Sequence, residues 1–114
     1  SEAEQLTLFN IEMADITDVQ MVLSRGRRLL AEIPGVREVS AGHTVAEGAK
    51  YRFLWRGVLA HADGLQTYIT HQNYRDFSHR LLSSISSDKM TVLYQSMDTI
   101  PMGEGGALKA VSWV

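Results

Sequence analysis

The sequence contains no cysteine, which excludes disulfides, thiolate metal sites and a cysteine nucleophile. Proline is scarce, with two residues, and no apolar run approaches the roughly 20 residues that a helix needs to cross a bilayer. The segment Ser1–Glu4 lacks the basic and apolar parts of a signal peptide. We therefore expect a cytoplasmic protein with no membrane partner.

A strong charge of one sign is also missing. The formal net charge is −2 at pH 7, so the surface as a whole would attract neither nucleic acid nor an anionic membrane. The basic cluster of Arg25, Arg27 and Arg28 has no interleaved aromatic residue and is typical of a solvated helix face, with phosphate or an acidic ligand as the alternative contact. No phosphate-binding glycine pattern occurs. We expect no nucleic acid partner and no nucleotide cofactor.

The spacing of the four histidines argues against a metal site. His71 and His79 would lie about 12 Å apart along a helix that rises 1.5 Å per residue. No H-x-x-x-H or H-x-H pair occurs, and His43 and His61 stand alone in the sequence. We expect no bound metal and no other cofactor.

The 114 residues match the size of one domain. We expect that domain over residues 1–97 and a tail over residues 98–114 that adds a strand. Hydrophobic periodicity and turn residues predict strands over 6–11, 36–45, 51–60 and 90–97, and helices over 17–33 and from residue 63 onward, with a break at 71–74. This order predicts an α+β, ferredoxin-like fold in which both helices cover one face of an antiparallel four-stranded sheet.

The strand over 51–60 carries apolar side chains on both faces. Alternation turns Tyr51, Phe53 and Trp55 to one side, and the two helices can cover only one side. We expect the other face to form a homodimer interface, in which buried arginines must be paired with acidic or carbonyl groups. The residues of this predicted interface are Leu6, Leu8, Arg52, Leu54, Arg56 and Val58.

Gly26 stands on the apolar stripe of the first predicted helix, although glycine costs about 1 kcal/mol relative to alanine inside a helix. Two interpretations follow. Either the helix approaches the sheet closely at this position, or Gly26 leaves space for something else, such as a ligand.

Three segments resemble the Dabb family, the stress-responsive dimeric α/β-barrel proteins. They are residues 32–39 with Gly42, residues 65–71 and the late strand ending at Tyr94, and the sharpest element is Tyr68-x-x-His71. The resemblance spans residues 5–97. It implies a ferredoxin-like domain that pairs into a dimeric α/β barrel.

In that family the helix usually continues as His-Pro-x-His. In the related olivetolic acid cyclase, the tyrosine and the final histidine are credited with an aldol cyclisation. Here Tyr68 and His71 match the pattern, whereas Tyr74 stands where the cyclase has its catalytic histidine. Tyr68 and His71 are therefore the candidate catalytic residues for a cofactor-free cyclase or lyase-type proton transfer, although a tyrosine and a histidine bonded to backbone near a helix end would give the same pattern.

Two functions remain open. The first is a domain that binds a small aromatic or polyketide-like molecule between helices and sheet. The second is a non-catalytic structural or interaction protein of the stress response, with Trp55 filling the space beside Gly26. A cavity next to Tyr68 and His71 would separate the two. The expected pocket is lined by Thr7, Phe9, Val22, Gly26, Phe53, Trp55, Tyr74 and Phe77, and the resemblance adds Gln5 and Leu23.

Overall fold

A computed structural model describes residues 2–12 and 16–95 of the chain. It contains a four-stranded sheet in the order β2-β3-β1-β4, in which every neighbouring pair is antiparallel. The predicted ferredoxin-like arrangement is confirmed. The strands are β1 (Ala3–Phe9), β2 (Val36–His43), β3 (Phe53–Leu59) and β4 (Lys89–Gln95).

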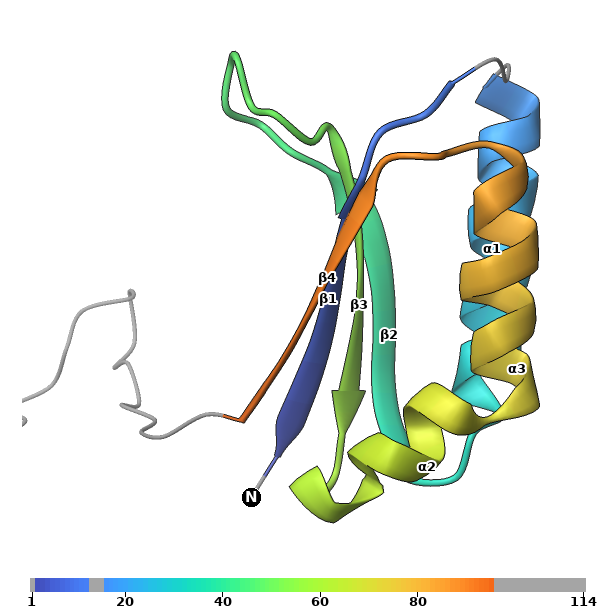
Figure 1. Cartoon of the computed structure of the whole chain (residues 1–114), viewed down its shortest axis with the longest axis vertical. Coiled ribbons are helices and arrows are strands. Elements are labelled where there is room, and N and C mark those ends of the chain that lie inside the picture. Colours follow the sequence, from blue (N-terminus) through green and yellow to red (C-terminus); the bar gives the residue numbers. More distant parts are fainter. Residues whose placement is uncertain (1, 13–15, 96–114) are drawn as a thin grey trace, which may run out of the picture.

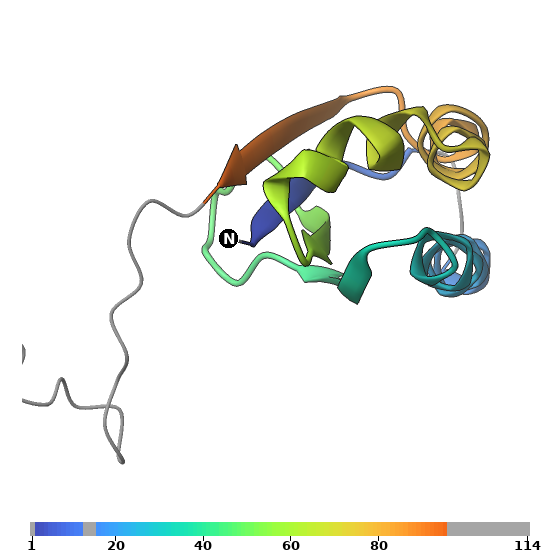
Figure 2. The same ribbon diagram turned by 90° about the horizontal axis from the view of Figure 1, so that it is seen from below.

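Both helical layers cover the same face of this sheet (Figures 1 and 2). The first is α1 (Ile16–Ala31), which ends two residues before the predicted limit. The second helical segment spans residues 62–84 and changes its winding several times. It consists of the 3₁₀ turn η1 (Ala62–Gly64), α2 (Leu65–Thr70), α3 (Gln72–Arg75), the π-helix η2 (Asp76–Leu81) and the 3₁₀ turn η3 (Leu82–Ser84).

The alternation of β1 determines what lies under the helices. Gln5, Thr7 and Phe9 are fully buried on the helix side, while Leu6 and Leu8 on the other side are half-buried. The strand ends at Phe9, earlier than predicted. The buried set includes two polar residues, which therefore require partners inside the protein.

Aromatic rings fill the centre of the core. The Trp55 ring lies 4.9 Å from that of Phe77 and 5.8 Å from that of Tyr74, centroid to centroid. Tyr68 packs edge-on against Tyr74 at 5.0 Å. Since Trp55 is buried, the predicted inward face of β3 is confirmed.

The predicted tail strand and the domain boundary at residue 97 lie outside the described residues. Within the described stretches, no helix combines the length and the apolar character needed to span a bilayer.

Candidate ligand site

The space beside Gly26 is occupied by the ring of Phe77. A Cβ atom at Gly26 would lie 2.3 Å from Cε1 of that ring and 2.4 Å from Cδ1. Phe77 in turn packs on Trp55, and both side chains are 1% exposed. The space beside Gly26 is therefore filled by Phe77 of the second helical segment, and neither by a close approach of the sheet nor by Trp55.

A chain of hydrogen bonds runs through the interior beneath the second helical segment. The Tyr68 hydroxyl donates to Oε1 of Gln5 at 2.8 Å, and Nε2 of Gln5 donates to Oγ1 of Thr7 at 2.7 Å. Thr7 Oγ1 lies 2.8 Å from Oγ1 of Thr91, an exposed residue of β4. Gly57 makes this route possible, because a Cβ there would lie 2.5 Å from the Tyr68 hydroxyl oxygen. The chain thus links the buried phenol to the protein surface.

The two buried tyrosines stay protonated at neutral pH. Burial raises the pKa of the Tyr68 phenol, and the neighbouring Tyr74 adds to the rise. Burial also raises the pKa of Tyr74, against an opposing effect of hydrogen bonds with Ser78 and Thr91. Both phenols are therefore suited to donate a hydrogen bond rather than to accept a proton.

His71 lies at the break in the second helical segment. Its backbone is extended, with φ −64° and ψ 142°, and its Nδ1 accepts a hydrogen bond from the backbone N–H of Asn73 at 3.0 Å. It therefore caps the start of α3. Tyr68 lies within α2, and His71 follows its last residue, Thr70, where the predicted break begins. Their catalytic role stays a prediction.

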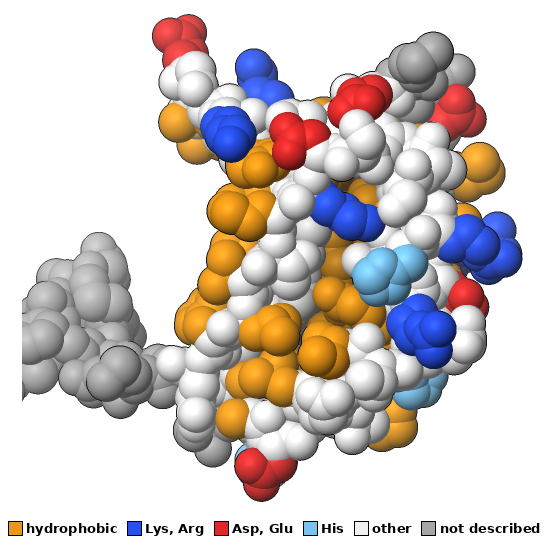
Figure 3. All heavy atoms as spheres, in the orientation of Figure 1, with side chains coloured by type: hydrophobic (Ala, Val, Ile, Leu, Met, Phe, Trp, Pro, Cys, Tyr) orange, Lys and Arg blue, Asp and Glu red, His pale blue; other side chains and the backbone are white. Residues whose placement is uncertain are grey.

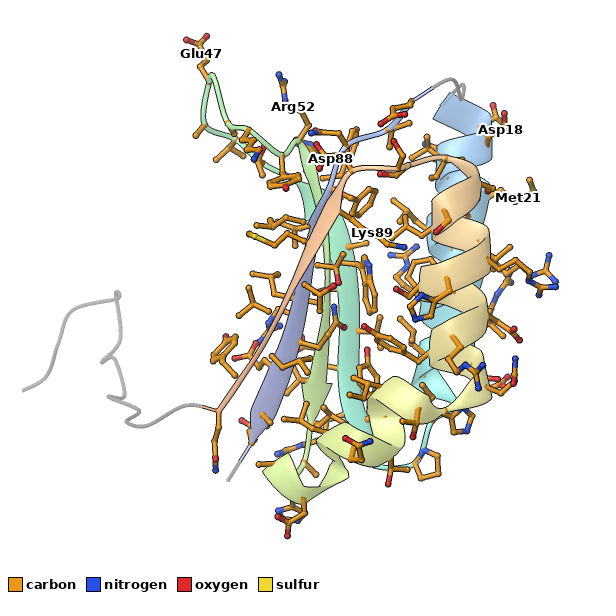
Figure 4. All side chains as sticks on the ribbon, in the orientation of Figure 1. Asp18, Met21, Glu47, Arg52, Asp88 and Lys89 are labelled. Carbon is orange, nitrogen blue, oxygen red and sulfur yellow. The ribbon has the colours of Figure 1, made fainter. Side chains whose placement is uncertain are left out.

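Lys89 ties β4 to the π-helical turn. Its Nζ donates to the carbonyl oxygen of Ser78 and to Oγ of Ser83, the latter at 3.0 Å, and the side chain extends from β4 toward the second helical segment (Figure 4). Partial burial lowers the pKa of Lys89. This contact bonds a carbonyl of the π-helix to a side chain from the facing strand.

An open groove lies next to the packed core, between α1 and β2. It has a volume of about 220 Å³. Its apolar walls come from Val19, Leu23, Ala41 and Phe53, and its polar lining from Gln20, Arg27 and His43, with Gly42 completing it. We call this the α1–β2 groove.

A second hollow adjoins this groove, and a buried indole lies on the neighbouring strand. A second hollow of about 320 Å³, lined by His43, Thr44, Arg52 and Phe53, shares two residues with it. Ala41 pairs with Trp55 across the β2–β3 ladder. The Trp55 Nε1 atom is buried and has no hydrogen-bond partner in the described part of the chain. An acceptor that reached this donor would gain a hydrogen bond.

The sheet face opposite the helices is largely apolar. Met90 and Val92 are 45% and 41% exposed, and hydrophobic side chains follow the side of the molecule away from the helices (Figure 3). Of the predicted interface residues, Leu6, Leu8 and Leu54 are half-buried and Arg52 is exposed. Val58 differs, because it is already buried within the single chain.

A row of polar groups crosses this same face. Arg56 forms ion pairs with Glu4 and Glu38, the latter at 3.1 Å, and the Tyr94 hydroxyl donates to Glu4 at 2.6 Å. The expectation of paired arginines is confirmed for Arg56, whereas the Arg52 side chain has no ion pair among the described residues. We call Glu38, Arg56, Glu4 and Tyr94 the cross-sheet row, since they come from all four strands.

The sequence-predicted pocket residues are brought together, but mostly by packing on one another. Of these residues, Phe53 and Leu23 line the α1–β2 groove. Ala41 and His43 were not predicted to line the groove. Their alternation on β2 and the helical spacing of Val19 and Leu23 nevertheless indicate that these side chains face one another. No group of three metal-ligating side chains occurs within residues 2–12 and 16–95.

No model of a known protein family matches the chain, and no curated protein matches its sequence. Solved structures do match. A Dabb family protein with a ferredoxin-like fold from Mesorhizobium loti superposes with a TM-score of 0.74 at 14% identity, over 85% of this chain and 98% of the other. The chain has a Dabb-like fold.

Two further structures share this fold. A dimeric ferredoxin-like protein of unknown function from Thermobifida fusca has a TM-score of 0.68 at 21% identity, over 82% of this chain and 89% of that one. SnoaB, a cofactor-independent oxygenase from Streptomyces nogalater, has a TM-score of 0.68 at 15% identity, over 88% and 97%. At these identities the likeness establishes the fold alone.

Proposed function

We propose that the protein is a homodimeric domain that binds a small aromatic or polyketide-like molecule between α1 and the sheet. The observation that carries the proposal is the α1–β2 groove, with apolar walls and the Phe53 ring beside a few polar groups. Small-molecule sites generally combine these features. The fold is shared with a cofactor-independent oxygenase, which adds support for a small-molecule role.

Binding is tested by titrating aromatic ketones and phenols while tryptophan fluorescence is recorded, with Ala41→Leu as the variant. The larger side chain would occupy groove volume without adding a polar group. The affinity derived from the saturable quenching should therefore fall at least tenfold. Val45→Leu is the matched control, because Val45 is 93% exposed and does not line the groove. Equal binding by the parent and Ala41→Leu, or no saturable binding to the parent, would contradict the proposal.

The homodimer rests on the uncovered apolar face of the sheet. Leaving such a face in water is unfavourable by roughly 25 cal/mol per Å² of apolar area, and the Thermobifida fusca neighbour is described as dimeric. Val92→Asp would put a charge on this face and should give a monomeric mass by light scattering at micromolar concentration. Met21→Asp is the control, because Met21 is exposed on α1 and points away from the sheet (Figure 4). A dimer that survives Val92→Asp would argue for another interface.

A second candidate, a non-catalytic interaction protein with a filled core, is favoured by the packing of Phe77 on Gly26. The two candidates differ in whether the α1–β2 groove takes a ligand. Catalysis by Tyr68 and His71 is a separate prediction. Turnover that falls in both Tyr68→Phe and His71→Gln, with binding retained, would support it.

A further inference from the structure

The charge around the α1–β2 groove differs from that of the chain as a whole. The protein is net negative, yet no acidic residue lines the groove, whereas Arg27 and His43 do. The adjoining hollow adds Arg52. The charged side chains that line the two hollows are therefore all basic.

These basic groups come from opposite sides of the apolar surface. Arg27 lies on α1, whereas His43 ends β2 and pairs with Phe53 across the ladder. The structure gives Arg27 no ion-pair partner among the described residues. His43 Nδ1 lies 3.3 Å from the carbonyl oxygen of Thr44, a contact that occupies one ring nitrogen and leaves Nε2 for another partner.

Phe53 determines the shape of ligand that would fit. Its ring stacks on the buried Phe9 ring, with a centroid distance of 5.8 Å and an interplanar angle of 25°. This stacking holds the Phe53 ring in place at the junction of the two hollows. A planar ligand could therefore pack against the apolar wall while an anionic group reaches the guanidinium of Arg27.

We propose that the α1–β2 groove binds a small aromatic monocarboxylate, with the ring against Phe53 and Leu23 and the carboxylate paired with Arg27. This inference rests on the proposed function and names the ligand class for it. The groove volume of about 220 Å³ accommodates a ligand of one or two fused rings. Arg27 acts here as a binding residue that distinguishes an acid from its neutral analogue.

The test compares 2-naphthoate with 2-naphthamide by isothermal titration calorimetry at low salt. The two probes have nearly the same size and differ in charge. We expect the acid to bind at least tenfold more tightly than the amide, a difference of about 1.4 kcal/mol. Raising the ionic strength should reduce this preference, because solvent-exposed ion pairs are screened.

Arg27→Gln should remove most of the preference for the acid and leave binding of the amide unchanged. Arg28→Gln is the matched control, because it removes the same charge from the next position of α1, outside the groove lining. Circular dichroism would verify that both variants fold. Equal affinity for acid and amide in the parent, or an unchanged preference in Arg27→Gln, would overturn the carboxylate inference and leave the binding function standing. Failure of both probes to bind the parent would overturn both proposals.

Discussion

The contact between Gly26 and Phe77 predicts that a glycine-to-alanine change destabilises the protein at this position, the opposite of its usual effect in a helix. In an ordinary helix interior, glycine to alanine stabilises by about 0.8–1.0 kcal/mol. Here the new Cβ would lie 2.3–2.6 Å from three ring carbons of Phe77, whereas carbon atoms in favourable contact are about 3.5–4.0 Å apart. The ring would have to move by roughly 1 Å or more.

The surroundings of Phe77 oppose that movement. Trp55 packs on one side of the ring at 4.9 Å, and Phe77 has almost no exposed surface. Overpacking of this kind costs about 1–3 kcal/mol, and the upper half of that range applies because three ring atoms are affected. After subtracting the gain in helix propensity, Gly26→Ala should lower the free energy of unfolding by about 1–2 kcal/mol.

A double-mutant cycle with Phe77→Leu separates the two contributions. The smaller, flexible leucine can turn away from α1, so Gly26→Ala should stabilise in this background by up to about 1 kcal/mol. The coupling between the two positions would then be about 2–3 kcal/mol. Guanidinium unfolding at one fixed protein concentration, followed by tryptophan fluorescence and circular dichroism, measures all four proteins. If Gly26→Ala stabilises the parent by about 1 kcal/mol, the close packing of α1 on Phe77 is wrong.

Two further predictions concern polar groups. Tyr68→Phe leaves Oε1 of buried Gln5 without its donor, so unfolding should become easier by about 1–3 kcal/mol, and a loss below 0.5 kcal/mol would argue that the bond is replaced. The Tyr94 hydroxyl and Arg56 hold the pKa of Glu4 below its usual value, against partial burial. The ionised Glu4 carboxylate therefore stabilises the fold above pH 4.5, and this contribution is lost as the pH falls through the lower pKa that Glu4 has in the folded protein. Because Arg56 is 36% exposed, we expect only about 0.5–1 kcal/mol, and Glu4→Gln should flatten this part of the stability profile.

Much of the fold could be predicted because its signals are local. The alternation of side chains along β3 predicts that Trp55 faces inward. It also predicts a second apolar face of the sheet, which the two helices cannot cover. The break near His71 was also visible, since the residues from 71 to 74 are polar or aromatic and interrupt the helical stripe. These features depend on neighbouring residues, which a sequence displays directly.

The candidate site was harder to predict because it depends on contacts between distant segments. The sequence places Gly26 on a buried stripe but does not say that the Phe77 ring occupies the space beside it. The bond from Tyr68 to Gln5 depends on Gly57, which lies on a third element. The π-helical turn that carries Phe77 likewise has no signature in composition or spacing.

Strand β1 has polar side chains on both of its faces, and their partners fix its register in the sheet. Gln5 faces the interior, where Tyr68 and Thr7 bond it, whereas Glu4 faces outward to Arg56 and Tyr94. A slip of β1 by one residue would exchange the two faces. It would bury the Glu4 carboxylate without a cation and leave Gln5 beside Arg56, an unfavourable exchange at both positions. Polar partners on both faces therefore hold β1 in register, and with it the sheet that supports the α1–β2 groove on one side and the proposed dimer interface on the other.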